Sequence, residues 1–428
     1  MGGEWDRRSL LRGASVAAGA AVIAPLLGRA GTARADGDAD ALFKAGEFEQ
    51  AGRAYEEILK KDPANVHAAR RRGHVGLLVN DFPEAEKYLK QALELAPADK
   101  ETNQLLGDCY IRQDEFAGSV PCWQAAGEDV YAQWFGAVSG APYQIHGDTA
   151  RVPWRQMDPS PQVEASVNGG PPKRFMFYTG APWLGMSAEV AEEAGLRAVA
   201  KQQIDYLNGT AWQYFGVLDF FRLGDIELRN IPVEWSETDQ ASPAGPSDGI
   251  IGTWIFYHLL TTFDYAGRSL ILRRPTAGTA AKVRADAVRA GAKPLPLYLA
   301  HEHGLHSRGS VDGSGTQVVG LSIGGVSESA AVVPGETAER LGIRVDHDRP
   351  VETFAHSRPT VTYPCYPKEI RLGDAAARGV YCMTNPNSRP PRSGFDVLAT
   401  FFHPFYKPYN ITLDFTRMNL YITPGKAA

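Results

Sequence analysis

The sequence predicts an α+β multidomain protein in which an α-helical array precedes a mainly β, two-lobed region. Three observations predict this organisation. From about residue 40 to residue 127, aromatic and small residues recur with the roughly 34-residue period of a helix pair. Beyond residue 160, short β-type runs alternate with turns rich in Gly, Asn and Asp. The same order of hairpin, loop, helix and strand motifs then occurs twice, which indicates two similar lobes.

The composition restricts the classes of function. The 428 residues are 44% hydrophobic and 22% charged, with a formal net charge of −5. This composition supports two or three domains with hydrophobic cores but offers no concentrated basic face for nucleic acid. Apart from the N-terminus, no apolar run reaches the roughly 18–20 residues of a membrane-spanning helix. We therefore expect no nucleic-acid partner, and no membrane span once the N-terminal signal is removed.

The first 35 residues have the order of regions of an export signal. Residues 6–12, DRRSLLR, precede an Ala-rich apolar stretch over 14–27, and small residues occupy positions 33 and 35. The basic segment resembles a twin-arginine motif, with Leu10 where Phe is commoner. The resemblance predicts a signal peptide over 1–35, cleavage after Ala35, and an extracellular, periplasmic or cell-envelope location. The alternative is an uncleaved anchor or an unstructured tail.

Within the helical segment, equivalent positions carry similar residues. Small residues stand where paired helices would touch, and Pro follows the second helix of a pair. The matching sets are Phe48, Phe82 and Phe116; Ala51 and Ala85; Gly73 and Gly107; Ala92 and Ala126; and Pro63 and Pro97. The pattern resembles tetratricopeptide repeats and predicts them over 36–127, as two full units and half of a first. So short an array is expected to lean on the region that follows it. Its concave face either binds a peptide or another protein or, as we favour, the array is a spacer or docking platform.

The segment 128–160 is rich in aromatic residues, Gly and Pro, and is predicted to be a linker that packs against both neighbours. The first β copy has a hairpin turn at 167–169, the loop Phe-Tyr-Thr-Gly-Ala over 177–181, and a helix over 187–196. A Gly-Asp turn at 224–225 and the run Gly-Ile-Ile-Gly at 249–252 follow. The second copy has a turn at 311–313, a Gly-rich loop over 319–325, a helix over 336–343, and a Gly-Asp turn at 373–374.

This order resembles the active-site segment of retropepsin-like aspartic proteases, where a hairpin leads into hydrophobic-Asp-Thr-Gly-Ala and a hydrophobic-hydrophobic-Gly strand returns beside the loop. The resemblance implies a bilobal, pepsin-like fold with a cleft between the lobes. It places lobe 1 at 161–275, an interlobe connection at 276–307, and lobe 2 at 308–424. Asp264 and Asp414 fall on the last strand of each lobe and are expected to be structural.

The two catalytic aspartates of that family are missing. By the resemblance, Tyr178 and Ser322 occupy their positions. Ile323 replaces the Thr that hydrogen-bonds across the dyad, and Ala399 replaces a Gly of the returning strand. Two carboxylates about 3 Å apart share one proton in an aspartic protease, whereas a phenol and an alcohol are poor bases near neutral pH. We therefore expect hydrolysis by the usual dyad to be lost.

Residues next to these two positions are the candidates for contacts with a ligand in the cleft. They combine the loop backbone with aromatic side chains that suit an apolar or aromatic ligand. A hydrophobic core is the alternative role for the aromatic side chains. The candidates are Thr179, Gly180, Trp183, Ile323, Gly324, Trp212 and Tyr214.

Histidines, Ser322 and the cysteines offer further candidate chemistry. His301 and His303 would share one face of a strand, which makes them and His306 weak candidates for metal ligands, although we favour a polar hairpin tip and expect no cofactor. A Ser-His-Asp triad built on Ser322, with His347, His356 or His403 as base, lacks a nucleophile elbow. The four cysteines form disulfides Cys109–Cys122 and Cys365–Cys382 or remain buried thiols.

These observations give three hypotheses of function. The first is an exported pseudoprotease that binds a peptide or small molecule in the interlobe cleft without hydrolysing it. The second is a repurposed enzyme of isomerase or cyclase type that uses Tyr178 in the same cleft, with Ser322 assisting. The third is an atypical peptidase. The sequence leaves open whether the protein is an enzyme.

Overall fold

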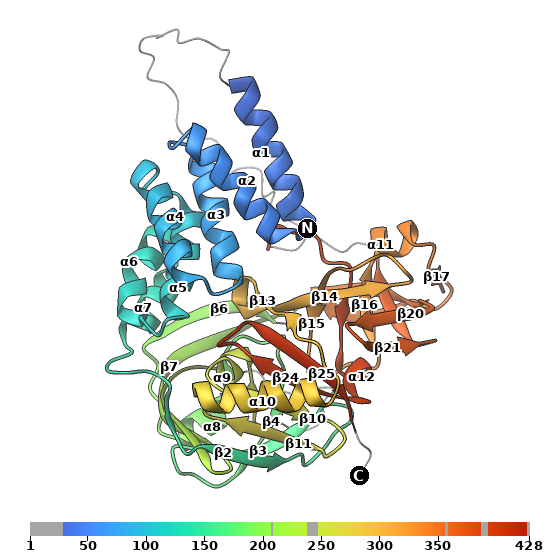
Figure 1. Cartoon of the computed structure of the whole chain (residues 1–428). Coiled ribbons are helices and arrows are strands. Elements are labelled where there is room, and N and C mark those ends of the chain that lie inside the picture. Colours follow the sequence, from blue (N-terminus) through green and yellow to red (C-terminus); the bar gives the residue numbers. More distant parts are fainter. Residues whose placement is uncertain (1–28, 207–208, 238–246, 356–357, 387–392, 426–428) are drawn as a thin grey trace, which may run out of the picture.

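The computed structural model describes residues 29–206, 209–237, 247–355, 358–386 and 393–425. An N-terminal array of helices stands on a mainly β region, as the sequence predicts (Figure 1). The helices of the array are α1 (Arg29–Lys44), α2 (Phe48–Lys61), α3 (Val66–Leu78), α4 (Phe82–Leu95), α5 (Lys100–Ile111), α6 (Phe116–Ala126) and α7 (Asp129–Gly136).

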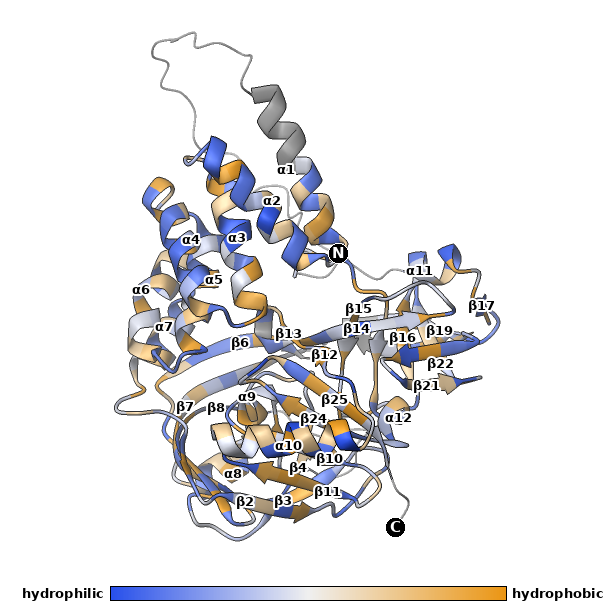
Figure 2. Cartoon of the chain, viewed as in Figure 1, coloured by the Kyte–Doolittle hydropathy of each residue, from blue (hydrophilic) through white to orange (hydrophobic). Residues whose placement is uncertain are grey.

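The helices pack in pairs, α1 with α2, α3 with α4, and α5 with α6. Figure 2 shows α2 to α5 as bands of hydrophilic and hydrophobic residues, as expected for helices with one buried face. Local sequence sets their starts, because Asn65, Asp81 and Asp99 accept hydrogen bonds from the first turns of α3, α4 and α5. The sequence predicted only half of the first unit. Helix α1 completes it.

The predicted signal peptide lies mostly outside the described residues, which begin at residue 29. Helix α1 begins at Arg29 and continues to Lys44. The predicted cleavage position after Ala35 therefore falls within this helix. Among the helices that the structure describes, none is long and apolar enough to span a membrane.

The segment 128–160 contains regular structure that the sequence reading missed. It forms α7 and two strands, β1 (Gln144–His146) and β2 (Thr149–Pro153). The indole of Trp134, on α7, is fully buried and donates a hydrogen bond of 2.8 Å to the carbonyl of Gly216. Strands β1 and β2 pair with β8 and β11 of the β region. The segment packs against both neighbours, as predicted.

Lobe 1 is built around an eight-stranded sheet of order β1-β8-β5-β9-β4-β3-β7-β6. The predicted helix is α8, shorter at both ends than expected, and the short helix α9 follows the returning strand β9. The elements are β3 (Gln162–Val167), β4 (Lys173–Phe177), β5 (Leu184–Ser187), α8 (Ala188–Glu193), β6 (Ala200–Tyr206), β7 (Gly209–Leu223), β8 (Ile226–Ser236), β9 (Gly249–Ile251) and α9 (Thr253–Tyr257).

Lobe 2 repeats this plan in an eleven-stranded sheet. Strand β15 runs parallel to β23, just as β4 runs parallel to β9 in lobe 1. The elements are β13 (Tyr298–Leu299), η1 (His301–His303), β14 (Leu305–Val311), β15 (Gln317–Leu321), β16 (Ala331–Pro334), α11 (Gly335–Arg340), β17 (Arg344–Val345), β18 (Val351–Ala355), β19 (Arg358–Tyr366), β20 (Glu369–Leu372), β21 (Ala375–Arg378), β22 (Cys382–Asn385), β23 (Thr400–Phe401) and α12 (His403–Tyr406).

The two lobes share a six-stranded sheet of order β12-β25-β24-β10-β11-β2. Strand β10 ends at Asp264 and β24 at Asp414, and these two strands pair across the lobe boundary. Both carboxylates are buried in local hydrogen bonds, to Arg151, Gly267 and Ser269 or to Thr416, which agrees with a structural role. The remaining elements are β10 (Leu260–Asp264), β11 (Ser269–Arg273), α10 (Ala277–Arg289), β12 (Leu295–Pro296), β24 (Tyr409–Asp414) and β25 (Asn419–Pro424).

Matching turns confirm the duplication residue by residue. The hairpin turn of lobe 1 has φ of 46° at Asn168 and 75° at Gly169, and that of lobe 2 has 47° at Asp312 and 72° at Gly313. The two Gly-Asp turns each have φ of 58° at their glycine, Gly224 and Gly373. Two left-handed residues in succession are typical of tight hairpin turns, which favour Asn, Asp and Gly.

Candidate functional site at the junction of the two loops

The loops that carry Tyr178 and Ser322 lie against each other, and each is anchored to its own lobe in the same way. The amide of Tyr178 donates to the carbonyl of Ile251 at 3.0 Å, and the amide of Ser322 donates to that of Phe401 at 2.9 Å. Tyr178 also forms an antiparallel bridge with Gly324. The structure therefore brings together the two positions predicted to replace the catalytic pair. We call this region the loop junction.

Thr179 provides a one-sided connection across the loop junction. Its hydroxyl accepts a hydrogen bond from the amide of Ile323 at 2.8 Å and donates to the carbonyl of Leu321 at 3.3 Å. Ile323 has no hydroxyl, so its side chain cannot make the reciprocal pair of bonds. The carbonyl of Thr179 instead accepts from the hydroxyl of Thr253 at 2.8 Å. Only one half of the reciprocal pair of hydrogen bonds is therefore present, and it connects the two loops.

The Tyr178 ring lies against two glycines. A Cβ atom at Gly180 would be 2.2 Å from Cζ of the ring, and one at Gly325 would be 2.4 Å from Cδ2. Gly325 also has φ of 69° and donates its amide to the carbonyl of Phe177 at 3.0 Å. The phenol is half-buried, and among the described residues its hydroxyl has no hydrogen-bond partner. The ring is thus fixed by its contacts while its hydroxyl remains free to bind.

Ser322 is 4% exposed, and its hydroxyl has no hydrogen-bond partner among the residues that the structure describes. No described Asp or Glu side chain hydrogen-bonds to either Tyr178 or Ser322. His403 bonds to Tyr265 rather than to Ser322, at 3.2 Å from the phenol oxygen. The residues needed for a carboxylate dyad or for a Ser-His pair are therefore not assembled in the described part of the loop junction.

The other predicted contact residues separate into two groups. Thr179, Gly180, Ile323 and Gly324 belong to the loop junction. Trp212 and Tyr214 lie on β7, where Lys201 stacks over the Trp212 ring at 4.7 Å and the Tyr214 hydroxyl hydrogen-bonds to Glu237. These two aromatic residues therefore contact the β6–β7 hairpin and the neighbouring strand β8 with the residue that follows it, and not the two loops.

Comparisons with known proteins identify two parts of the chain. Residues 163–254 match a family model described as aspartyl protease, and residues 38–100 match one described as tetratricopeptide repeat. The chain contains tetratricopeptide repeats followed by an aspartyl protease domain. No curated protein matches the chain. Among solved structures, a mutant O-GlcNAc transferase of Thermobaculum terrenum aligns at 17% identity with a TM-score of 0.24, over 27% of this chain and only 24% of that protein.

The histidine cluster lies at the tip of the β13–β14 hairpin, which is the interpretation favoured over a metal site on a strand. Residues 301–303 form the 3₁₀ turn η1, so His301 and His303 do not share a strand face. His306 lies on β14 and its Nδ1 is 3.0 Å from the carbonyl oxygen of Gly304. Among the described residues, no group of three His, Cys, Asp or Glu side chains is placed to hold a metal ion.

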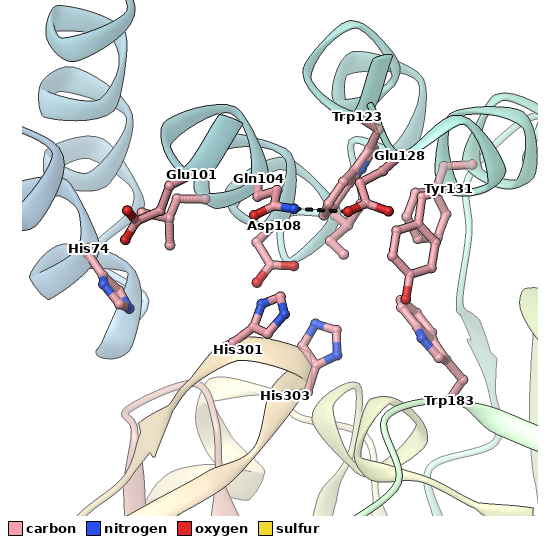
Figure 3. A pocket seen from close by; sticks show the side chains of 13 residues that line it. His74, Glu101, Gln104, Asp108, Trp123, Glu128, Tyr131, Trp183, His301 and His303 are labelled. Carbon is pink, nitrogen blue, oxygen red and sulfur yellow. Dashed lines mark hydrogen bonds between the residues drawn. The ribbon is translucent and has the colours of Figure 1, made fainter. Parts of the chain in front are cut away.

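A cavity of about 370 Å³ lies between the repeats and the aspartyl protease domain (Figure 3). Trp183 reaches it from the segment that follows the Tyr178 loop, and His303 from η1. We call it the junction pocket. The residues that line it are His74, Glu101, Gln104, Leu105, Asp108, Ile111, Trp123, Glu128, Tyr131, Phe135, Trp183, His301 and His303. The sequence singled out Trp183, His301 and His303. The other lining residues come from the helical array, and only the fold shows which surface lies opposite them.

Burial sets the charge of two histidines in the junction pocket. His74 is 7% exposed, and desolvation lowers its pKa to about 3. His303 is 1% exposed, and desolvation lowers its pKa well below the ordinary value, with the Arg112 guanidinium adding to the effect. Both imidazoles are neutral near pH 7, so each ring carries one donor and one acceptor nitrogen.

The cysteines are buried free thiols, which is one of the two alternatives drawn from the sequence. Burial raises the pKa of Cys109 to about 12 and that of Cys122 to about 11. Cys365 and Cys382 are directly paired residues of neighbouring strands β19 and β22, without a bond between them. A buried thiol with a raised pKa is a weak nucleophile, so we assign no catalytic role to these residues.

Proposed function

We propose that the chain is an exported aspartic-protease-like protein that binds a peptide or small molecule at the loop junction and does not hydrolyse it by an aspartate dyad. The observation that supports this proposal is the environment of Tyr178. Its ring lies on Gly180 and Gly325, and its backbone is bridged to Gly324 of the other loop. By the resemblance, Tyr178 and Ser322 stand where the two aspartates are expected. A phenol and an alcohol supply hydrogen-bond donors for a ligand carbonyl but no base to activate water.

A repurposed enzyme is the second candidate. The fixed ring and unpartnered hydroxyl of Tyr178 suit a hydrogen-bond donor that polarises a carbonyl or enol. The Tyr178→Phe variant separates the candidates, because it removes the donor and keeps the ring. Loss of turnover in this variant indicates catalysis, whereas a binding protein loses affinity only as far as the hydroxyl contacts the ligand.

Cleavage of a diverse peptide library from pH 3 to pH 8, read by mass spectrometry, tests the proposal. The wild-type chain is compared with the double variant Tyr178→Asp/Ser322→Asp and with a triple variant that adds Ile323→Thr. The added threonine supplies the hydroxyl for hydrogen bonds that reciprocate those of Thr179. We expect no cleavage by the wild type and some by the triple variant. Cleavage by the wild type that disappears in Tyr178→Phe would show an atypical peptidase and overturn the proposal.

A further inference from the structure

The junction pocket is built by both parts of the chain. Helices α3, α5, α6 and α7 with the turn after α6 supply one side, and the Trp183 loop and η1 supply the other (Figure 3). Glu101 and His301 are exposed, whereas Asp108, His303 and Trp183 are buried. The pocket therefore has an open mouth at the first two residues and a floor at the other three.

His303 on the floor lacks the partners that its chemistry requires. Its ring packs against Trp254 at 3.8 Å and Trp183 at 5.2 Å between ring centres. Both ring nitrogens are buried and have no hydrogen-bond partner among the described residues. Nδ1 of His74 is likewise buried and has no hydrogen-bond partner among the described residues. Unpaired buried nitrogens of this kind point to an occupant of the pocket that supplies both an acceptor and a donor.

The charges that line the pocket are negative. Glu101 pairs with Arg70 and Arg71, and Asp108 pairs with Arg112 at 3.5 Å. Glu128 accepts a hydrogen bond of 3.0 Å from Gln104, and no described Lys, Arg or His side chain is within ion-pair distance of it. No Lys or Arg is among the lining residues. Glu128 is thus a half-buried carboxylate that lacks a cation.

Aromatic rings adjoin Glu128. Trp123 and Tyr131 pack at 5.3 Å between ring centres, and Figure 3 shows both beside the Glu128 carboxylate. A carboxylate next to aromatic faces suits an ammonium group, which gains an ion pair and a cation–π contact at one position. A neutral imidazole at the floor suits an amide, which presents one carbonyl and one N–H.

We propose that the junction pocket binds the free N-terminus of a peptide. The ammonium group lies at Glu128, the first peptide amide lies at His303, and an apolar first side chain contacts Trp183 and Tyr131. This site is separate from the loop junction and does not depend on the ligand proposed there. It gives the repeats a binding role that uses the face docked on the aspartyl protease domain.

Titration calorimetry of the full chain tests the site with three probes: phenylalanyl-glycyl-glycine, its N-acetyl form, and phenethylamine. We expect saturable binding of the free peptide and at least tenfold weaker binding of the acetylated form, which lacks the charge. Phenethylamine, which lacks the amide, should also bind more weakly. The proposal would be overturned if the acetylated peptide bound equally well. It would also be overturned if the free peptide showed no saturable binding at millimolar concentration. Equal binding of phenethylamine would exclude the amide contact.

Single substitutions test where the peptide binds. Glu128→Gln keeps a hydrogen-bonding partner for Gln104 and removes the charge, so we expect a tenfold or greater loss of affinity. Glu94→Gln, an exposed change on α4, is the matched control and should have no effect. If Glu128→Gln leaves affinity unchanged, or if Tyr178→Phe abolishes it, the peptide binds at another place and the pocket assignment is wrong. Thermal unfolding of each variant shows that it is folded.

Discussion

At the residue scale, the position of Tyr178 depends on the absence of two side chains. Gly180 and Gly325 leave the space in which the ring lies, and each would collide with it if it carried a Cβ atom. A smaller side chain at position 178 would leave that space open. The glycines and the tyrosine therefore form one unit, which allows a test by paired substitution.

Gly325→Ala should destabilise the chain by about 2–4 kcal/mol, because it adds the strain of a left-handed alanine to a collision with the Tyr178 ring. Gly313→Ala is the matched control. Its φ is 72°, close to the 69° of Gly325, but nothing lies within 4 Å of the added atom. We expect about 1–2 kcal/mol there. Denaturant unfolding measures both. In a Tyr178→Ala background the two costs should become equal, and a difference that persists would contradict the contact.

His403 makes stability depend on pH. Its side chain is fully buried, and desolvation lowers its pKa from 6.5 to about 4, with Lys407 adding to the effect and Asp158 opposing it. Between these two values the unfolded chain binds a proton that the folded chain does not. The contribution is therefore complete above pH 6.5 and is lost as the pH falls toward 4, by at most about 1.4 kcal/mol per pH unit.

Unfolding by urea at pH 7, 6 and 5 measures this slope. We expect the free energy of unfolding to decrease at each step. The decrease should be smaller in His403→Gln, because the unfolded variant lacks the one proton that His403 would bind. The comparison uses the slope and not the absolute stability, because the substitution also changes packing against Tyr265. An identical slope in both proteins would show that His403 does not carry the effect.

The sequence singled out the residues of the loop junction but only Trp183, His301 and His303 of the junction pocket. Tyr178 and Ser322 follow from local motifs, since a hairpin, a loop and a helix in fixed order place them. His301 and His303 lie at a hairpin tip, the interpretation that the sequence favoured, because the chain between the paired strands β13 and β14 makes a 3₁₀ turn with φ of 59° at His303. Glu128 carries no local signal, because its role depends on what lies opposite it.

At the scale of elements, small residues set how closely paired helices approach. A Cβ atom at Gly107 on α5 would be 2.8 Å from the Trp123 ring on α6, and one at Gly73 on α3 would be 2.6 Å from Leu89 on α4. The 34-residue pattern found these contacts from the sequence, because the repeat places equivalent residues at equivalent interfaces. Helix α7 lies outside the 34-residue pattern. It was not predicted, because the segment 128–160 that contains it is rich in Gly and Pro and indicated a linker.

Gly107→Ala and Gly118→Ala should have opposite effects. The first adds a methyl group against the buried Trp123 ring and should cost about 1–3 kcal/mol. The second lies on the exposed face of α6, where the added atom has nothing closer than 3.8 Å. Alanine is the better helix former, so Gly118→Ala should gain about 0.5–1 kcal/mol. Thermal and denaturant unfolding measure both, and a loss in each variant would show that helix propensity is not the controlling factor at Gly118.

At the scale of the whole molecule, the array is fastened to both lobes. Phe48 of α2 packs against Tyr298 at 4.8 Å and Phe395 at 5.0 Å, and Trp134 of α7 packs against Trp183 at 4.9 Å between ring centres. The sequence predicted the two parts, their order and the need of a short array for support. The mutual orientation rests on contacts between residues far apart in the chain, which no local pattern encodes.

Arg112 joins the two parts most directly. The side chain is 4% exposed and donates from Nη1 to the carbonyls of Leu77 at 2.8 Å and Leu299 at 3.0 Å, and from Nη2 to that of Ala300 at 3.2 Å. One buried guanidinium thus connects α3, α5 and the strand before η1. Its removal takes away the ion pair of the Asp108 carboxylate and one hydrogen bond from each of the three carbonyls, although those of Leu77 and Ala300 still accept from the amides of Asn80 and His303.

Arg112→Met should therefore cost about 3–5 kcal/mol, the range for breaking a buried ion pair, although methionine keeps much of the apolar stem. Arg53→Met is the matched control, because its ion pair with Glu49 is exposed and should contribute less than about 1 kcal/mol. Amide hydrogen exchange by mass spectrometry locates the loss. We expect faster exchange in α1 to α6 than in β10 and β24, since the array loses its support while the shared sheet keeps its pairing. Equal acceleration throughout would show that the array and the lobes unfold as one unit, and a cost no larger than that of Arg53→Met would show that the aromatic contacts alone hold the array in place.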